Sequence, residues 1–90
     1  MTIELDYCPR QKQGITKSII DGHAVLLNDQ NEQALVLNAS SHIIWELCDG
    51  ATSITQMIAS LQTAFPEAQA QIPTDVISAL RAMKQADVVR

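Results

Sequence analysis

Ninety residues with a mass of 9.9 kDa can form a single domain with one small hydrophobic core, which leaves little room for a deep catalytic pocket. The formal net charge of −4 and the pI near 4.8 disfavour a nucleic-acid partner, because affinity for phosphates comes largely from clustered Lys and Arg. The small size favours a binding module over an enzyme.

The sequence carries no signal for export or membrane insertion. Residues 1–10 lack the apolar run of a signal peptide, and no stretch approaches the roughly 20 apolar residues of a membrane span, so we expect a cytoplasmic protein without a membrane partner. Cys8 and Cys48 are far apart and lack metal-binding spacing, so no zinc site is expected. We interpret Cys48 as a small core residue of a helix and Cys8 as a free thiol.

The first part of the chain is predicted to contain an arm and three strands. Residues 1–16 show no hydrophobic periodicity and are expected to form a flexible N-terminal arm ahead of one domain over residues 17–90. Asp21-Gly22 is typical of a two-residue hairpin turn. The apolar runs around it predict an antiparallel meander with strands over residues 17–21, 23–28 and 33–38.

Three helices are predicted to follow, over residues 41–48, 53–65 and 73–86. Asn38 or Ser40 is the candidate N-cap of the first helix. The second opens with a Ser53-x-x-Gln56 capping box. This order of elements predicts an α+β fold of the winged helix-turn-helix type, with a three-stranded antiparallel sheet followed by three helices.

The third predicted helix carries more apolar surface than one contact requires. Leu80 belongs to a stripe that should face the core, whereas Ile77 lies around the helix beside Arg81 and Lys84, at i+4 and i+7. This second face is either a binding surface or, in the simpler interpretation, a site where Ile77 packs on the sheet. The opposite flank carries a row of small side chains that would let another backbone come close: Ala79, Ala82 and Ala86.

No set of residues in the sequence is arranged for catalysis. His23 and His42 lack the nearby nucleophile and carboxylate of a triad, and Glu46 and Asp49 are explained by a solvated helix face. With only three glycines there is no Gly-rich phosphate loop. We therefore expect neither an enzyme nor a bound cofactor.

Two specific functions remain open for a non-catalytic domain of this fold. Residues 55–61 resemble the helix that opens many helix-turn-helix units, so a DNA-binding winged-helix regulator is the first alternative. However, no Lys or Arg lies between Asp49 and Leu80 to contact phosphates, so no nucleic-acid partner is expected. The second alternative is a small structural or dimerisation domain, which leaves a homodimer open.

Five short motifs carry a family resemblance that covers about residues 17–89. They are His-Ala-Val-Leu-Leu-Asn at 23–28, Leu-Val-Leu-Asn at 35–38, Trp-Glu-Leu-Cys-Asp-Gly at 45–50, Phe-Pro-Glu at 65–67 and Asp-Val-Ile at 75–77. Together they resemble the PqqD-like family of peptide chaperones, named for pyrroloquinoline quinone (PQQ) biosynthesis and also known as the precursor-peptide recognition element of RiPP (ribosomally made, modified peptide) biosynthesis. The chain departs from the family at Ala79, where a bulky residue is frequent, and at Asp87, where glycine is frequent.

The resemblance implies a winged-helix domain that binds the leader of a precursor peptide and presents it to a modifying enzyme, often a radical S-adenosylmethionine protein. In the family the leader adds as a strand to strand three and lies in the groove beside helix three. An open strand edge next to a helix with an additional apolar face is suited to such strand addition. The basic pair on helix three favours a leader with acidic groups around one apolar anchor. The implied peptide-binding residues are Gln33, Ala34, Leu35, Val36, Leu37, Asn38, Ile77, Leu80, Arg81 and Lys84.

Overall fold

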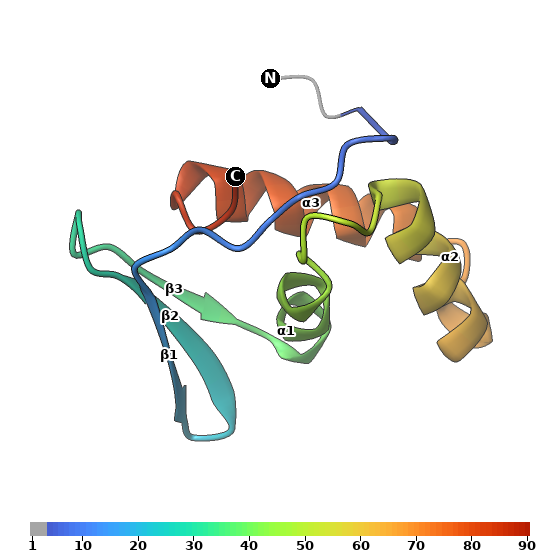
Figure 1. Ribbon diagram of the computed structural model, residues 1–90. Helices are drawn as coiled ribbons and strands as arrows, with labels where there is room; N and C mark the ends of the chain where they lie inside the picture. Colours follow the sequence, from blue (N-terminus) through green and yellow to red (C-terminus); the bar gives the residue numbers. More distant parts are fainter. Residues whose placement is uncertain (1–3) are drawn as a thin grey trace.

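A computed structural model describes residues 4–90, in which a sheet lies at one end of the molecule and helix α2 at the other (Figure 1). The predicted α+β order, with a three-stranded antiparallel sheet followed by three helices, is confirmed. The elements are β1 (Ile15–Ile20), β2 (His23–Asn28), β3 (Ala34–Leu37), α1 (Ala39–Glu46), α2 (Ile54–Ala64), the 3-10 helix η1 (Pro66–Ala68) and α3 (Ile72–Gln85).

The sheet is a meander in the order β1-β2-β3, and local turn chemistry sets its register. Asp21 and Gly22 have φ angles of 51° and 79°, and two consecutive positive φ angles are the mark of the hairpin turn that matches the strand twist. The inner face presents Ala24, Leu26 and Leu37 to the helices. The outer face is only partly covered, since Leu27 and Val36 are exposed there.

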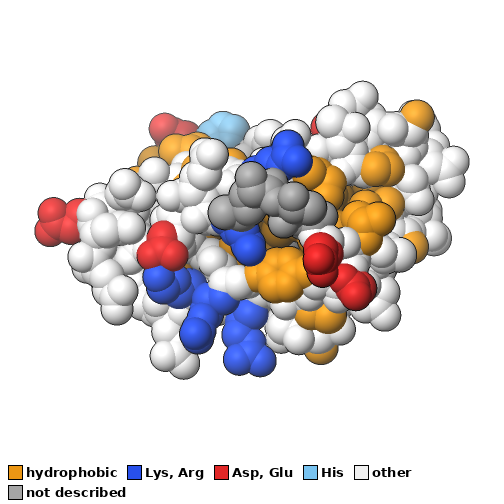
Figure 2. Space-filling model, turned by 90° about the horizontal axis from the view of Figure 1, so that it is seen from above, with side chains coloured by type: hydrophobic (Ala, Val, Ile, Leu, Met, Phe, Trp, Pro, Cys, Tyr) orange, Lys and Arg blue, Asp and Glu red, His pale blue; other side chains and the backbone are white. Residues whose placement is uncertain are grey.

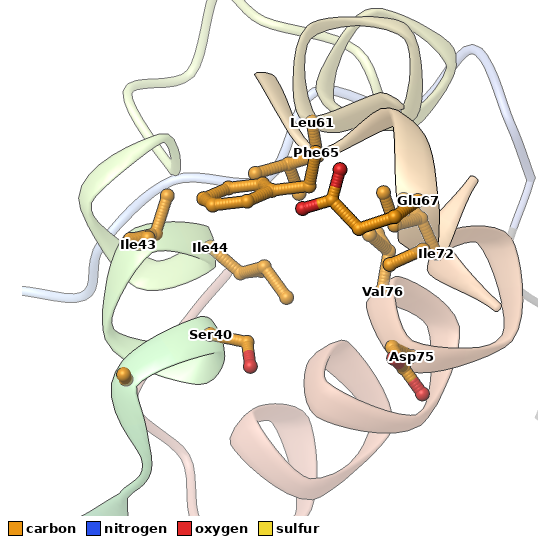
Figure 3. A pocket seen from close by; sticks show the side chains of 11 residues that line it. Ser40, Ile43, Ile44, Leu61, Phe65, Glu67, Ile72, Asp75 and Val76 are labelled. Atoms are coloured by element: carbon orange, nitrogen blue, oxygen red, sulfur yellow. The ribbon is translucent and has the colours of Figure 1, made fainter. Parts of the chain in front are cut away.

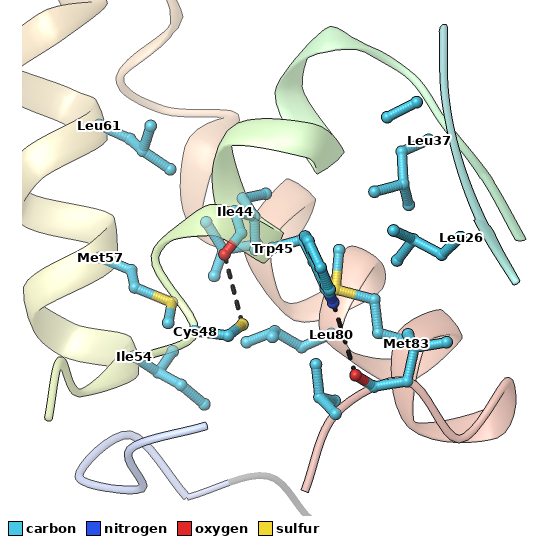
Figure 4. Packing of buried hydrophobic residues seen from close by; sticks show 14 of the residues in the cluster. Leu26, Leu37, Ile44, Trp45, Cys48, Ile54, Met57, Leu61, Leu80 and Met83 are labelled. Atoms are coloured by element: carbon cyan, nitrogen blue, oxygen red, sulfur yellow. Dashed lines mark hydrogen bonds between the residues drawn. The ribbon is translucent and has the colours of Figure 1, made fainter. Parts of the chain in front are cut away.

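The core lies between the sheet and the three helices, and Trp45 is at its centre (Figure 4). Its indole Nε1 donates to the Val88 carbonyl at 3.4 Å, which connects α1 to the chain beyond α3. Cys48 is buried as predicted, its thiol donates to the Ile44 carbonyl at 3.3 Å, and burial raises the pKa of this thiol to about 12. Cys8 is a free, half-buried cysteine.

Side chains cap the first two helices. The Asn38 side chain accepts from the Ser41 amide at 2.9 Å and begins α1, while Ser53 and Gln56 form the predicted capping box of α2. Helix α1 ends at Glu46, earlier than predicted, and leads into a turn organised by Asp49. The Asp49 carboxylate accepts from the amides of Ala51 and Thr52 at 2.9 and 2.8 Å, and these hydrogen bonds lower its pKa.

Residues 5–12, which we call the N-terminal strap, cross the ends of all three α-helices (Figure 1). At the start of α2, the amides of Ile54 and Thr55 donate to strap carbonyls at 3.1 and 3.0 Å, which satisfies two amides that a helix cannot pair internally. Beyond α1, the Gly50 amide donates to the Pro9 carbonyl at 2.9 Å. Near the end of α3, Arg10 pairs with Arg90 in both directions, at 3.3 and 2.8 Å.

The structure of the strap differs from the flexible arm that was predicted for residues 1–16. Residues 5–12 are fixed by backbone hydrogen bonds, Pro9 is buried and β1 already begins at Ile15. Glycine is favoured at position 50, where the strap passes, because φ is 79° in the left-handed region. Residues 1–3 of the predicted arm lie outside the described residues.

Tyr7 provides a test of how tightly the strap is packed. Its ring contacts the core and lies under the Lys84 ammonium, whose Nζ is 4.6 Å from the ring centroid. Its hydroxyl is buried and has no hydrogen-bond partner within residues 4–90. We expect Tyr7→Phe to raise the free energy of unfolding by up to about 1 kcal/mol, because it removes an unsatisfied polar group. Tyr7→Ala should lower it by about 2 kcal/mol or more.

Urea unfolding followed by Trp45 fluorescence measures both variants, because the reporter is not the residue that is changed. A Tyr7→Phe protein destabilised by more than about 1 kcal/mol would show that the hydroxyl has a partner after all. A neutral Tyr7→Ala change would contradict the packed strap.

Candidate functional site

Strand β3 is an edge strand, and its outward backbone groups are unpaired within the described part of the chain. The Asn28 amide donates to the Gln33 carbonyl at 2.9 Å, which makes these residues a hydrogen-bonded pair between β2 and the start of β3. Since bonded and non-bonded pairs alternate along an antiparallel ladder, Leu35 and Leu37 bond to β2. Ala34 and Val36 therefore direct their N–H and C=O groups toward the open edge.

The opposite edge, β1, is less suited to pairing with another chain. Lys17 lies in the middle of β1 and forms an ion pair with Glu46 of α1 at 2.6 Å, and its hydrogen bond lowers the pKa of the Glu46 carboxyl. Lysine on an edge strand is a common defence against strand pairing. Strand β3, with the sequence Ala-Leu-Val-Leu, has no charged residue, and Val36 is 64% exposed.

A groove of about 360 Å³ continues from the end of β3. One wall is the start of α1 with Asn38, the residue that follows β3, and the other wall is the side of α3. The α3 wall consists of short side chains, which leaves the groove open: Asp75, Ser78, Ala79 and Ala82. Ala79 stands where the PqqD-like family often has a bulky residue, so a small side chain widens the groove at this position.

The predicted α3 residues do not all lie on this groove. Leu80 is only 2% exposed and belongs to the core. Ile77 is half-buried against the core, and Lys84 lies over the Tyr7 ring of the strap. Arg81 is exposed and lies beside Ile77 on a shallow surface of α3.

Helix geometry explains this placement. At 100° per residue, Ile77, Arg81 and Lys84 occupy the flank opposite to the one that carries Ala79 and Ala82. Ile77, Arg81 and Lys84 therefore do not line the groove that continues from β3, and their contact with a peptide stays a prediction. The small-residue row takes that place through Ala79 and Ala82, whereas Ala86 is partly buried against the core.

A second, more apolar pocket of about 270 Å³ adjoins the groove between α1, the end of α2, η1 and the start of α3 (Figure 3). This pocket was not predicted from the sequence. Phe65 before Pro66 was a signal for it, because a large apolar residue at the position where a helix must end is available to line a pocket. In the structure the Phe65 side chain reaches toward Ile43 and Ile44, and the Glu67 carboxylate lies beside it (Figure 3).

The charges are unevenly distributed. Lys and Arg side chains gather over the strap and the end of α3 (Figure 2), where Lys12 pairs with Asp87. By contrast, the charged residues that line the groove and the pocket are both acidic, Asp75 and Glu67. The described residues contain no metal-binding group of three or more His, Cys, Asp or Glu. None of the helices in residues 4–90 is long and apolar enough to cross a membrane.

An α+β domain with an uncharged sheet edge that continues into a groove has the geometry to which an extended peptide can add as a further strand. A family model described as Coenzyme PQQ synthesis protein D (PqqD) matches residues 23–89, and the chain belongs to this family. No curated protein matches the chain by sequence.

Among solved structures, the chain is similar to one described as TbiB1 in complex with the TbiA(beta) leader peptide. The TM-score is 0.74 at 18% sequence identity, and the match covers 90% of this chain and 94% of that chain. At this level of identity, the similarity shows a shared fold.

The departure from the family at Asp87 is accommodated by the backbone. Asp87 follows α3 with a φ of 61°, the left-handed conformation for which glycine is the usual residue. Aspartate is one of the residues that tolerate it. The Asn28 side chain donates to the Asp87 carbonyl at 2.9 Å and the Lys12 ammonium pairs with its carboxylate, so contacts from the sheet and the strap hold this turn.

Proposed function

We propose that this protein is a non-catalytic peptide chaperone, which binds the leader of a ribosomally made precursor peptide by strand addition on β3 and presents it to a modifying enzyme. The observation that carries the proposal is the uncharged edge of β3. The backbone N–H and C=O groups of Ala34 and Val36 point toward this open edge, next to a groove with short side chains. Membership of the PqqD family supports it, as does the fold shared with a protein whose structure contains a leader peptide.

The binding energy follows from the geometry of the edge. Ala34 and Val36 each offer an N–H and a C=O to an added strand, and each hydrogen bond contributes about 0.5 to 1.5 kcal/mol net. Alternate side chains of the added strand would point toward α3 and bury apolar area in the groove. These terms must offset the cost of ordering a disordered peptide, which leaves affinities in roughly the micromolar to nanomolar range.

The remainder of the precursor would stay free for a modifying enzyme, because the protein holds only the leader. A radical S-adenosylmethionine protein is the enzyme class that the family resemblance implies, and PQQ biosynthesis is one candidate pathway among RiPP pathways. Short reading frames beside the gene are the first source of test peptides. The DNA-binding alternative is weaker, because the α2 and η1 segments contain neither Lys nor Arg for phosphate contacts.

Replacing Val36 tests strand addition directly. Val36→Pro removes an amide that faces the open edge and does not serve the β2 ladder, so the fold should survive while peptide binding weakens about tenfold or more. The probe is a fluorescein-labelled leader encoded beside the gene or, where there is none, a peptide enriched on the parent protein from a random 15-residue display library. Fluorescence anisotropy gives Kd.

Val36→Ala is the matched control, because it removes the side chain and keeps the amide. We expect it to bind within about threefold of the parent protein, since Val36 is an exposed outer-face residue. Circular dichroism must show that the Val36→Pro protein is folded. A folded Val36→Pro protein with parental affinity would rule out strand addition at β3.

Filling the groove tests which flank of α3 contacts the peptide. Ala82 is exposed and lines the groove, so Ala82→Trp should leave stability nearly unchanged and weaken binding of the same probe about tenfold or more by steric exclusion. Arg81→Trp adds comparable bulk one residue away, on the flank outside the groove, and should bind as the parent does. If Arg81→Trp weakened binding and Ala82→Trp did not, the peptide would contact the flank of α3 that carries Ile77 and Arg81.

A further inference from the structure

The pocket between α1, the end of α2, η1 and the start of α3 has an apolar floor and an apolar rim. Its floor consists of the buried side chains of Ile44, Leu61, Ile72 and Val76. Two large apolar residues stand open at its rim, Ile43 at 39% and Phe65 at 42% exposure. A cavity of roughly 150 Å³ lined by aliphatic and aromatic side chains can hold a benzene ring. The 270 Å³ here is therefore enough for one bulky apolar side chain.

This pocket is continuous with the groove beside β3. Ser40, Ile44 and Asp75 line both spaces. A peptide that pairs with β3 and continues past Asn38 therefore runs along the groove to the mouth of the pocket. The pocket is placed to receive a side chain from the leader segment that lies beyond the paired strand.

Two carboxylates give the pocket its electrostatic character. Glu67 and Asp75 line it, and neither has a salt-bridge partner within residues 4–90. The Asp75 carboxylate accepts a hydrogen bond from the Gln71 side chain at 3.2 Å. Among the described residues, no Lys or Arg lines the pocket or the groove, so an incoming cation would meet two acidic groups and no competing positive charge.

We propose that this pocket is the specificity subsite of the peptide site, and that it selects a bulky apolar side chain adjacent to a Lys or Arg in the leader. The inference rests on the proposed function and adds the chemistry of the peptide. It reverses the acidic leader expected from Arg81 and Lys84, since these two residues lie on the other flank of α3.

A display selection tests the subsite. Random 15-residue peptides are selected on the parent protein, on Phe65→Ala and on the double variant Glu67→Gln/Asp75→Asn. Peptides enriched on the parent should share an apolar residue next to Lys or Arg. The double variant should keep the apolar preference and lose the cation, whereas Phe65→Ala should lose the apolar preference. Glu4→Gln/Asp6→Asn removes two exposed charges from the N-terminal segment and should select as the parent does.

One enriched peptide then gives quantitative values. Changing its apolar anchor to Ala should weaken binding to the parent about tenfold or more. Changing the adjacent Lys to norleucine should weaken it about threefold or more at low ionic strength, and should have no effect on the Glu67→Gln/Asp75→Asn protein. Equal losses on the parent and the double variant would overturn the electrostatic part of the proposal. Melting temperatures show whether removing Asp75 from the first turn of α3 has changed the fold.

A small probe separates this inference from strand addition. In a ¹⁵N-labelled protein, 4-phenylbutylammonium should shift the amide signals of Ile43, Phe65 and Ala68 more than the anion 4-phenylbutyrate does, and Val36 should not respond. Enriched peptides that need the β3 edge but show no shared apolar and cationic pair would overturn the subsite and leave the proposed function standing. A failure to enrich any peptide, with no shift from either small probe, would overturn both.

Discussion

The strap's backbone hydrogen bonds are the constraint on which the arrangement of the three helices depends. Carbonyls of Leu5 and Tyr7 satisfy the first amides of α2, while Pro9 and Arg10 bind the backbone beyond α1 and α3. Buried backbone groups must find partners, so this one segment fixes three helix ends relative to one another. A sheet of three short strands would be marginal alone and needs helices packed on its inner face. The spacing between α1 and α3, which is the groove beside β3, therefore depends on a segment outside the groove.

Local signals explain what the sequence predicted correctly. Asp21-Gly22 specifies a hairpin turn within two residues, and Ser53 with Gln56 specifies a helix start within four. The strap carries no such signal, because its partners are backbone groups at positions 48 to 90 and a backbone hydrogen bond leaves no mark in side-chain type. A segment without hydrophobic periodicity was therefore predicted to be flexible, although its main chain is paired at almost every step.

The orientation of α3 shows a second limit of sequence reasoning. The stripe that includes Val76 and Leu80 determines which face of the helix points inward, but both flanks of that stripe remain equivalent until the packing of the chain places one of them beside β3. Ile77 and the two nearby cations were predicted to be the binding flank, but Ile77 packs against the core and Lys84 lies over the Tyr7 ring of the strap. The small side chains of Ala79 and Ala82 are the signal for the groove, because only a flank without bulk leaves space between α3 and α1.

Strand addition by itself cannot distinguish one peptide from another, because the N–H and C=O groups of Ala34 and Val36 would pair equally well with any extended chain. Selectivity must therefore arise where side chains are read. The groove beside β3 is lined mostly by short side chains, whereas the adjoining pocket has an apolar floor and two carboxylates. The net charge of −4 disfavours a nucleic-acid partner but does not indicate which peptides would bind. At a Debye length of about 8 Å under physiological salt, a peptide bound as proposed would respond to the charges next to it, Glu67 and Asp75, and much less to the basic groups over the strap.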